Sequence, residues 1–173
     1  ADLAIMAAKY TNAKIIGIDI SEKMLNIGNE KIKKYKFSNR ISLKLADAEK
    51  LPFKNNSFQA ITSGFGVRNF DSIDTGLSEM YRVLDKNGVL VILEPSKPSK
   101  FPVKQLYNIY FRYILPLLGT VISKDKNAYT YLTHSVNAFP PKKVFLKKLK
   151  ETGFKDCKHI PLTFGIVSLY SAK

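Results

Sequence analysis

The residues best suited to chemistry lie in the stretch Gly64–Phe70, which reads Gly-Phe-Gly-Val-Arg-Asn-Phe. A buried strand is expected just before it, at Gln59–Ser63, and a helix just after it, at Ile73–Leu84. Open α/β sheets bind their ligands at the carboxyl ends of strands, which is where Arg68 and Asn69 would lie. A guanidinium stays protonated near neutrality and offers several donors, so it suits an anionic partner. A glycine-rich turn with a solvated arginine would give the same pattern. This segment alone therefore does not distinguish a ligand site from a simple turn.

Two aspartates follow expected strands in the same way. Asp19 closes the run Ile15–Ile18, and Asp47 follows the run Ile41–Leu45. An acid one βα unit into a nucleotide-binding sheet typically holds ribose hydroxyls, and an acid on the next strand can accept from an adenine amine. Aspartate also caps turns routinely, so each position is weak alone. Together with the segment at Gly64, the two acids indicate a cofactor that contains adenosine.

The elements that would position these residues alternate between strand and helix. That alternation predicts a doubly wound parallel sheet, in which the unbroken apolar run 89–93 is a fully buried strand. After Pro95 the alternation stops, and residues 101–137 are expected to form an aromatic, helical insertion within a single domain that covers 1–173. The expected helices are 2–10, 22–35, 72–84 and 141–151, the strands are 13–19, 41–45, 58–63 and 89–93, a turn lies at 85–88, and a hairpin joins 154–160 to 164–171.

The chain is strongly basic, with a formal net charge of +14 over 173 residues. Between Lys97 and Lys150 the only carboxylate is Asp125. Such a surface attracts phosphates, either of nucleic acid or of anionic lipid, and several lysines together can hold a protein at a membrane. A lysine-rich composition that serves only solubility would give the same charge. The charge by itself therefore leaves the partner open.

Other features of the composition exclude some classes. The apolar stretches are too interrupted for a membrane span, which needs about 20 apolar residues. The single cysteine, Cys157, excludes an internal disulfide and fits a reducing compartment such as the cytoplasm. His134 and His159 lie far apart in the sequence without the spacing of metal ligands, so no metal site is expected.

Several longer runs are spread along the whole chain. They are Asp47–Phe53 (Asp-Ala-Glu-x-Leu-Pro-Phe), Phe65–Asn69, Met80–Leu84, Glu94–Pro98, Tyr129–Ser135 and Leu162–Val167. Together they resemble the ubiquinone/menaquinone C-methyltransferases (the UbiE/MenG family). The first run occurs in many methyltransferases that use S-adenosylmethionine (SAM), whereas Phe-Gly-Val-Arg-Asn and the C-terminal runs are more specific.

The resemblance implies a class I SAM-dependent methyltransferase fold, Rossmann-like, with strand order 3-2-1-4-5-7-6 and strand 7 antiparallel. It implies that Asp19 binds the SAM ribose, that Asp47 and Ala48 border the adenine, and that Gly64 lies beside the cofactor with only backbone to offer. The glycine-rich loop of the family would lie just before Asp2, so the chain resembles a fragment without strand 1 and that loop. We expect open strand edges there and weak SAM binding by these residues alone.

The implied reaction moves a methyl group from SAM to a ring carbon of a polyprenyl quinol, with demethylmenaquinol favoured as the acceptor. Arg68 is expected to stabilise the phenolate of the acceptor. A water or hydroxide held by Arg68 and Asn69 would accept the proton, or Asn69 would bind the second ring oxygen. His134 is the alternative base, because histidine titrates near neutrality.

Three other functions stay open on the sequence. They are the equivalent methylation of a benzoquinol, methylation of RNA, and an inactive membrane-associated binding domain. The expected partners are the polyprenyl quinol and an anionic membrane surface, without nucleic acid, and a homodimer is left open. The expected location is the cytoplasm, with contact to the inner face of the membrane.

Overall fold

The computed structural model describes residues 1–114 and 126–173, and gives only the backbone of residues 112 and 126–130. The described strands are β1 (Ile15–Asp19), β2 (Ile41–Leu45), β3 (Phe58–Gly64), β4 (Leu84–Pro95), β5 (Lys158–Leu162) and β6 (Val167–Ala172). The described helices are α1 (Asp2–Tyr10), α2 (Glu22–Lys34), α3 (Ile73–Val83), α4 (Val103–Ile109), α6 (Lys126–Ala138) and α7 (Lys142–Thr152). Shorter helical turns are η1 (Val67–Asn69), η2 (Tyr110–Ile114) and η4 (Thr163–Gly165).

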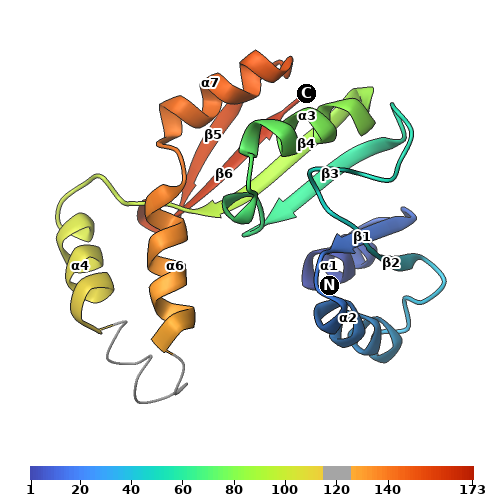
Figure 1. Cartoon of the computed structure of the whole chain (residues 1–173), viewed down its shortest axis with the longest axis horizontal. Coiled ribbons are helices and arrows are strands. Elements are labelled where there is room, and N and C mark those ends of the chain that lie inside the picture. The colour runs from blue at the N-terminus through green and yellow to red at the C-terminus, as the bar shows by residue number, and fades with distance from the viewer. Residues whose placement is uncertain (115–125) are drawn as a thin grey trace.

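The strands pair in two separate sheets. β1 and β2 are parallel, and the larger sheet has the order β3-β4-β6-β5, with β3 parallel to β4 and β6 antiparallel to both neighbours. Figure 1 shows β1, β2, α1 and α2 as one group at one end of the molecule, with α4 at the other. Among the described residues, β1 and β3 each pair on one side only.

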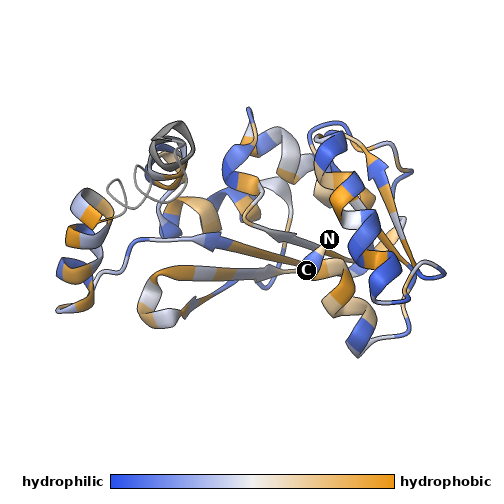
Figure 2. Ribbon diagram, turned by 90° about the horizontal axis from the view of Figure 1, so that it is seen from below, coloured by the Kyte–Doolittle hydropathy of each residue, from blue (hydrophilic) through white to orange (hydrophobic). Residues whose placement is uncertain are grey.

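The larger sheet carries the larger core. Helices α3 and α7 lie side by side over one face of it, and Figure 2 shows the helices striped by hydrophobic and hydrophilic residues. Aromatic rings fill the contact, because Phe145 of α7 meets Tyr170 of β6 with their centroids 4.6 Å apart. The buried residues of this core are Val67, Leu77, Met80, Leu84, Leu90, Ile92, Phe145, Leu149, Phe154, Tyr170 and Ala172.

The N-terminal group has a small core of its own. It is made of Ile5, Ala8, Ile32 and Ile41. The helix α2 begins where the sequence predicts, since the side chain of Ser21 accepts a hydrogen bond from the backbone N–H of Met24 and so caps it.

Several expected boundaries were wrong. β1 begins at Ile15 instead of residue 13, and β5 begins at Lys158 instead of residue 154. The expected turn at 85–88 lies inside β4, which already begins at Leu84. Leu84 pairs with Phe58 and Val89 pairs with Ala60, so the residues between them form an irregularity in the ladder and do not end the strand. The final strand begins at Val167, later than expected, because the η4 turn occupies the residues before it.

The aromatic insertion, residues 101–137, is helical in 103–114 and 126–138, and its residues 115–125 lie outside the described part. Tyr107 is buried and stacks on Phe111 at 4.3 Å, and burial raises the pKa of Tyr107 to about 12. Tyr110 and Tyr113 are exposed. The aromatic residues of this insertion therefore divide into an inner stack and an outer, exposed set.

Candidate active site

The turn after β3 is strained at its first residue. Phe65 has a φ of +59°, which is unusual for a bulky residue, and its backbone N–H donates to the carbonyl of Leu93 at 2.8 Å. The following η1 turn is closed by the backbone N–H of Asn69, which donates to the carbonyl of Gly66 at 3.0 Å. Backbone strain of this kind collects at functional sites. The turn therefore holds Arg68 and Asn69 on a rigid support.

The side chain of Arg68 is held against the protein and is only 12% exposed. Its Nη1 donates to the carbonyl of Phe65 at 2.5 Å and to Oε2 of Glu94 at 3.1 Å. Its Nε is buried without a partner among the described residues. The alternative of a solvated arginine is therefore wrong, and the guanidinium keeps one buried donor, Nε, that is not satisfied by the described residues.

Glu94, at the end of β4, was quoted in the sequence analysis only as part of the run Glu94–Pro98, and its place beside Arg68 was not predicted. Its side chain is 0% exposed, and Oε1 accepts from the backbone N–H of Val67 at 2.8 Å and more weakly from that of Arg68 at 3.4 Å. Burial raises the pKa of Glu94, although Arg68 and these N–H groups act in the opposite direction. The signal in the sequence was an acid that closes an apolar strand, next to the strand that presents an arginine.

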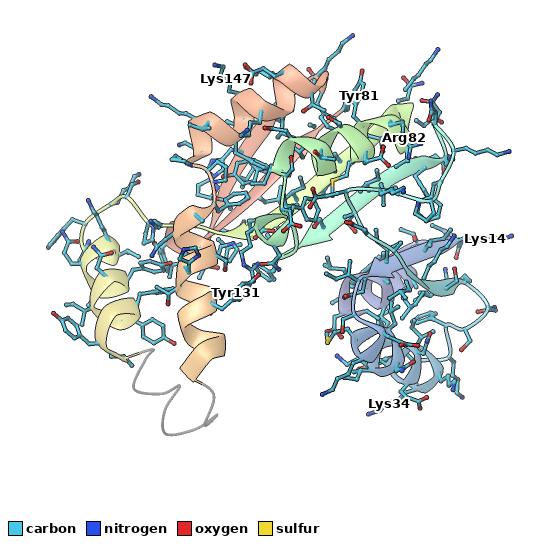
Figure 3. All side chains as sticks on the ribbon, in the orientation of Figure 1. Lys14, Lys34, Tyr81, Arg82, Tyr131 and Lys147 are labelled. Carbon is cyan, nitrogen blue, oxygen red and sulfur yellow. The ribbon has the colours of Figure 1, made fainter. Side chains whose placement is uncertain are left out.

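Asn69 is exposed and lies between two partners. Its Nδ2 donates to the carbonyl of Phe65 at 3.4 Å, and its Oδ1 accepts from the hydroxyl of Tyr131 at 3.0 Å. Figure 3 shows Tyr131 on α6, which links the aromatic insertion to the turn. His134, the alternative base, lies on the same helix and is exposed.

The two aspartates lie at the carboxyl ends of β1 and β2. Asp19 is paired with Leu45 in the ladder, and its carbonyl accepts from the backbone N–H of Ala46 at 3.1 Å. Oδ1 of Asp19 accepts from the backbone N–H of Ser21 at 2.8 Å. Asp47 follows directly, and the half-buried Ala48 comes next in the same turn. The carboxylate of Asp19 thus uses one oxygen, Oδ1, in a local turn.

Two contacts connect this aspartate cluster with the turn after β3. A Cβ built on Gly64 would lie 2.7 Å from Cδ1 of Leu3, so α1 packs directly against the end of β3. The carboxylate of Glu49 accepts from the backbone N–H groups of Asp71 at 2.7 Å and Ser72 at 3.0 Å, at the start of α3. All six expected site residues therefore lie at or just after the carboxyl ends of β1, β2 and β3, the edge at which open α/β sheets bind their ligands.

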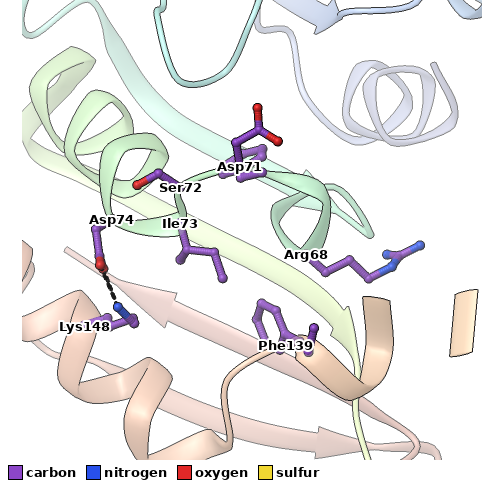
Figure 4. Close-up of a pocket in the computed structure, with 9 residues that line it drawn as sticks. Arg68, Asp71, Ser72, Ile73, Asp74, Phe139 and Lys148 are labelled. Atoms are coloured by element: carbon purple, nitrogen blue, oxygen red, sulfur yellow. Dashed lines mark hydrogen bonds and ion pairs between the residues drawn. The ribbon is translucent and has the colours of Figure 1, made fainter. Parts of the chain in front are cut away.

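A pocket of about 360 Å³ lies next to the η1 turn. It is lined by η1, the start of α3, the end of α6 and Lys148 of α7. Figure 4 shows the guanidinium of Arg68 directed away from the ion pair of Lys148 with Asp74, whose atoms are 2.7 Å apart. The guanidinium of Arg68 therefore does not point toward the ion pair of Lys148 with Asp74.

The chain matches the ubiE/COQ5 methyltransferase family over residues 1–173. It belongs to that family. A protein named demethylmenaquinone methyltransferase from Bacteroides fragilis is 46% identical over 172 residues, which are 99% of this chain and 70% of the relative. One named ubiquinone/menaquinone biosynthesis C-methyltransferase UbiE, from Citrifermentans bemidjiense, is 42% identical over 171 residues, covering 98% of this chain and 72% of the relative.

Solved structures confirm the expected class I methyltransferase fold of this family member. A putative S-adenosyl-L-methionine-dependent methyltransferase from Methanococcus maripaludis has a TM-score of 0.67 at 19% identity, covering 99% of this chain and 71% of that one. A putative methyltransferase from Bacillus halodurans has a TM-score of 0.63 at 23% identity, covering 92% and 62%. The protein is a methyltransferase that uses SAM as its methyl donor.

Proposed function

We propose that this protein transfers a methyl group from SAM to a ring carbon of a polyprenyl quinol, with demethylmenaquinol as the acceptor. The observation that carries the proposal is the family match along the whole chain, together with the position of Arg68 just after the end of β3. The names of the relatives favour a naphthoquinol acceptor, since several are called demethylmenaquinone methyltransferase.

Arg68 would stabilise the acceptor as a phenolate. A ring carbon is a weak nucleophile until the neighbouring hydroxyl loses its proton and pushes electron density onto it. The guanidinium is a permanent cation at the end of β3, so it can offset the negative charge of the phenolate oxygen. Asn69 would hold a water that takes the proton, or the second ring oxygen, because its Nδ2 carries two hydrogens and only one faces Phe65.

The cofactor side of the site would be formed by Asp19, Asp47, Ala48 and Gly64. SAM, when bound, supplies an electrophilic methyl group on a sulfonium. Asp19 would bind the ribose hydroxyls, whereas Asp47 and Ala48 would border the adenine. Gly64 would contribute backbone alone, in the position where a side chain would crowd the neighbouring α1.

Contact with an anionic membrane surface would bring the lipid substrate to the site. The segment around α4 exposes apolar side chains next to lysines, with Phe101 80%, Leu106 63% and Tyr113 62% exposed. Lys100 and Lys104 are exposed in the same segment. Cations on such a surface can bind anionic lipid headgroups, and the apolar side chains next to them can insert into the acyl chains below. No helix in residues 1–114 or 126–173 is long and apolar enough to cross a membrane.

The proposal is tested by a methyl-transfer assay with labelled SAM in the full-length protein, offering short-tailed demethylmenaquinol and the corresponding benzoquinol in parallel. Label in the naphthoquinone product is the expected result. Label only in the benzoquinone product would replace the acceptor, and absence of label in both, with SAM bound, would contradict the quinol assignment.

The assignment of Arg68 is tested in the same assay. Arg68→Ala is expected to reduce turnover to background, on the order of 1000-fold, because the phenolate loses its cation. SAM affinity, measured by calorimetry, is expected to change little, since Arg68 lies outside the aspartate cluster. Equal losses of turnover and SAM affinity would contradict the assignment.

A further inference from the structure

We propose that Glu94 is a positioning residue for methyl transfer, which fixes the η1 turn and the guanidinium of Arg68 in the orientation that receives the acceptor. This proposal rests on the proposed role of Arg68. Glu94 itself lies beneath the turn and is fully buried, so it acts through Arg68 and does not touch the acceptor.

The carboxylate of Glu94 holds both the backbone and the side chain of the same segment. Oε1 accepts from the backbone N–H of Val67 at 2.8 Å and Oε2 accepts from Nη1 of Arg68 at 3.1 Å. One carboxylate thus fixes both the backbone at the start of the η1 turn and the position of the guanidinium of Arg68. Because Nη1 is also tied to the carbonyl of Phe65, rotation of the guanidinium is blocked, and the unpartnered Nε is held in one direction.

The burial of Glu94 argues for a purpose beyond stability. A fully buried ion pair loses much of its attraction to the desolvation of both charges, and replacing it with apolar residues is often neutral. Here the arginine also keeps Nε without a partner, which adds a cost in the ligand-free protein. A pair that contributes little net stability but fixes a cation at a strand end is suited to orienting that cation for a ligand.

The chain offers a matched control in a second glutamate–arginine pair. Nε of Arg82 donates to Oε1 of Glu79 at 2.7 Å on α3, and Glu79 also accepts from the backbone N–H of Leu51 at 2.8 Å. This pair likewise binds one side chain and one backbone group, but it belongs to no part of the candidate site. Glu79→Gln therefore reports what the loss of such a pair does to the fold alone.

The first experiment compares Glu94→Gln and Glu79→Gln in the full-length protein by kcat, KM for SAM and thermal unfolding. Glu94→Gln is expected to lower kcat by about 100-fold, as a misplaced catalytic group does, with KM for SAM within about twofold. Glu79→Gln is expected to lower Tm and leave kcat within about twofold. A Glu94→Gln protein with lowered Tm but unchanged kcat would overturn the proposal, because the residue would then be structural only. Should the glutamine variant not fold, Glu94→Asp keeps the charge and retracts the carboxylate by one carbon, and the same two outcomes apply.

The second experiment does not depend on turnover. The Nε–H signals of arginine side chains are followed by ¹H–¹⁵N NMR in protein with labelled arginine. Glu94→Gln is expected to shift and broaden the signal of Arg68 and leave that of Arg82 in place, and Glu79→Gln is expected to do the reverse. An Arg68 signal unchanged by Glu94→Gln would overturn the proposal. A protein without methyl transfer to either quinol would contradict the proposed function, while this spectrum would still decide whether Glu94 fixes Arg68.

Discussion

Two arginines of this protein, Arg68 and Arg82, each pair with a glutamate, yet their donors are used very differently. Arg82 has a partner at each guanidinium nitrogen, and Figure 3 shows it on α3. Its partners are Glu79, the carbonyls of Leu51 and Phe53, and Oδ1 of Asn55, at 2.7 to 3.0 Å. Arg68 binds Glu94 and one carbonyl and keeps Nε without a partner.

The difference separates an arginine that builds the fold from one that serves the site. Arg82 joins the loop after β2 to α3, and its saturated fork leaves no donor for a ligand. Arg68 carries a similar charge on a strained turn at a strand end, with a buried donor that has no partner among the described residues. Both residues lie within motifs of the family, so the motifs alone do not distinguish the structural role from the site role. The two roles differ in how many guanidinium nitrogens already have a hydrogen-bond partner.

Among the tests of this comparison, replacing each arginine by lysine is expected to give the largest change. Arg68→Lys is expected to lower kcat by roughly 10- to 100-fold, because an ammonium cannot hold Glu94, Phe65 and the acceptor in one plane. Arg82→Lys is expected to lower Tm by several degrees and keep kcat within about twofold. The measurements are steady-state methyl transfer and thermal unfolding of the two variants. Similar kcat losses in both would show that the two pairs do not differ in role.

A smaller effect is expected at Tyr131, which joins the aromatic insertion to the neighbour of Arg68. Tyr131→Phe removes the hydroxyl that donates to Oδ1 of Asn69 at 3.0 Å and keeps the ring. We expect kcat to fall by about 3- to 10-fold, the value of one neutral hydrogen bond, because the amide of Asn69 is then free to rotate. Tyr110→Phe, on the exposed set of the same insertion, is the control and should leave kcat unchanged. Equal effects in the two variants would argue against the contact with Asn69.

The smallest expected effect is a difference in how the two glutamates respond to pH. The hydrogen bonds from Arg82 lower the pKa of Glu79 below its ordinary value of 4.5, so its ionised form favours the folded state. That stabilisation is present above pH 4.5 and is lost as the pH falls through the lowered pKa. Burial raises the pKa of Glu94, so its protonated form is the one that the fold favours, and that stability is lost as the pH rises through the raised pKa.

The two variants therefore should give pH profiles of opposite sign. The stability of the wild-type protein relative to Glu79→Gln should shrink as the solution becomes more acidic, and its stability relative to Glu94→Gln should grow. Denaturant unfolding across the acid range measures both differences. Profiles with the same sign would mean that Glu94 is stabilised as an anion as effectively as Glu79, and the contrast between the pairs would then rest on their donors alone.

Much of the fold was predictable because the main elements carry strong local signals. Ser21 caps α2 as expected, and the apolar run 89–93 lies in β4 as expected. The expected full burial of that run was wrong, because only Leu90 and Ile92 are buried and Val89 is exposed. The expected turn at 85–88 failed for a physical reason. Asp, Lys, Asn and Gly favour a turn locally, but pairing with Phe58 draws the start of the strand back to Leu84 and leaves those residues as an irregularity inside β4.

The site was predictable to the level of strand ends and no further. Asp19, Asp47 and Arg68 stand at strand ends in any parallel sheet of this order, so their gathering at one edge followed from topology. Glu94 was invisible as a partner because 26 residues separate it from Arg68 in the chain. Glu49 was quoted as part of a motif, and only the fold shows its carboxylate at the start of α3.

The sequence by itself determined the alternation of strands and helices, the family, and the kinds of group at each strand end, because these depend on local periodicity and motif spacing. Only the tertiary structure decided what each group does with its hydrogen bonds. The burial of Glu94 and the unpartnered Nε of Arg68 arise from the approach of β4 to the turn after β3, and the saturation of Arg82 arises from the return of the 51–55 loop to α3. Side chains far apart in the chain meet only when the core closes around them, which is why the distinction between a structural and a site arginine appears in the fold and not in the motif.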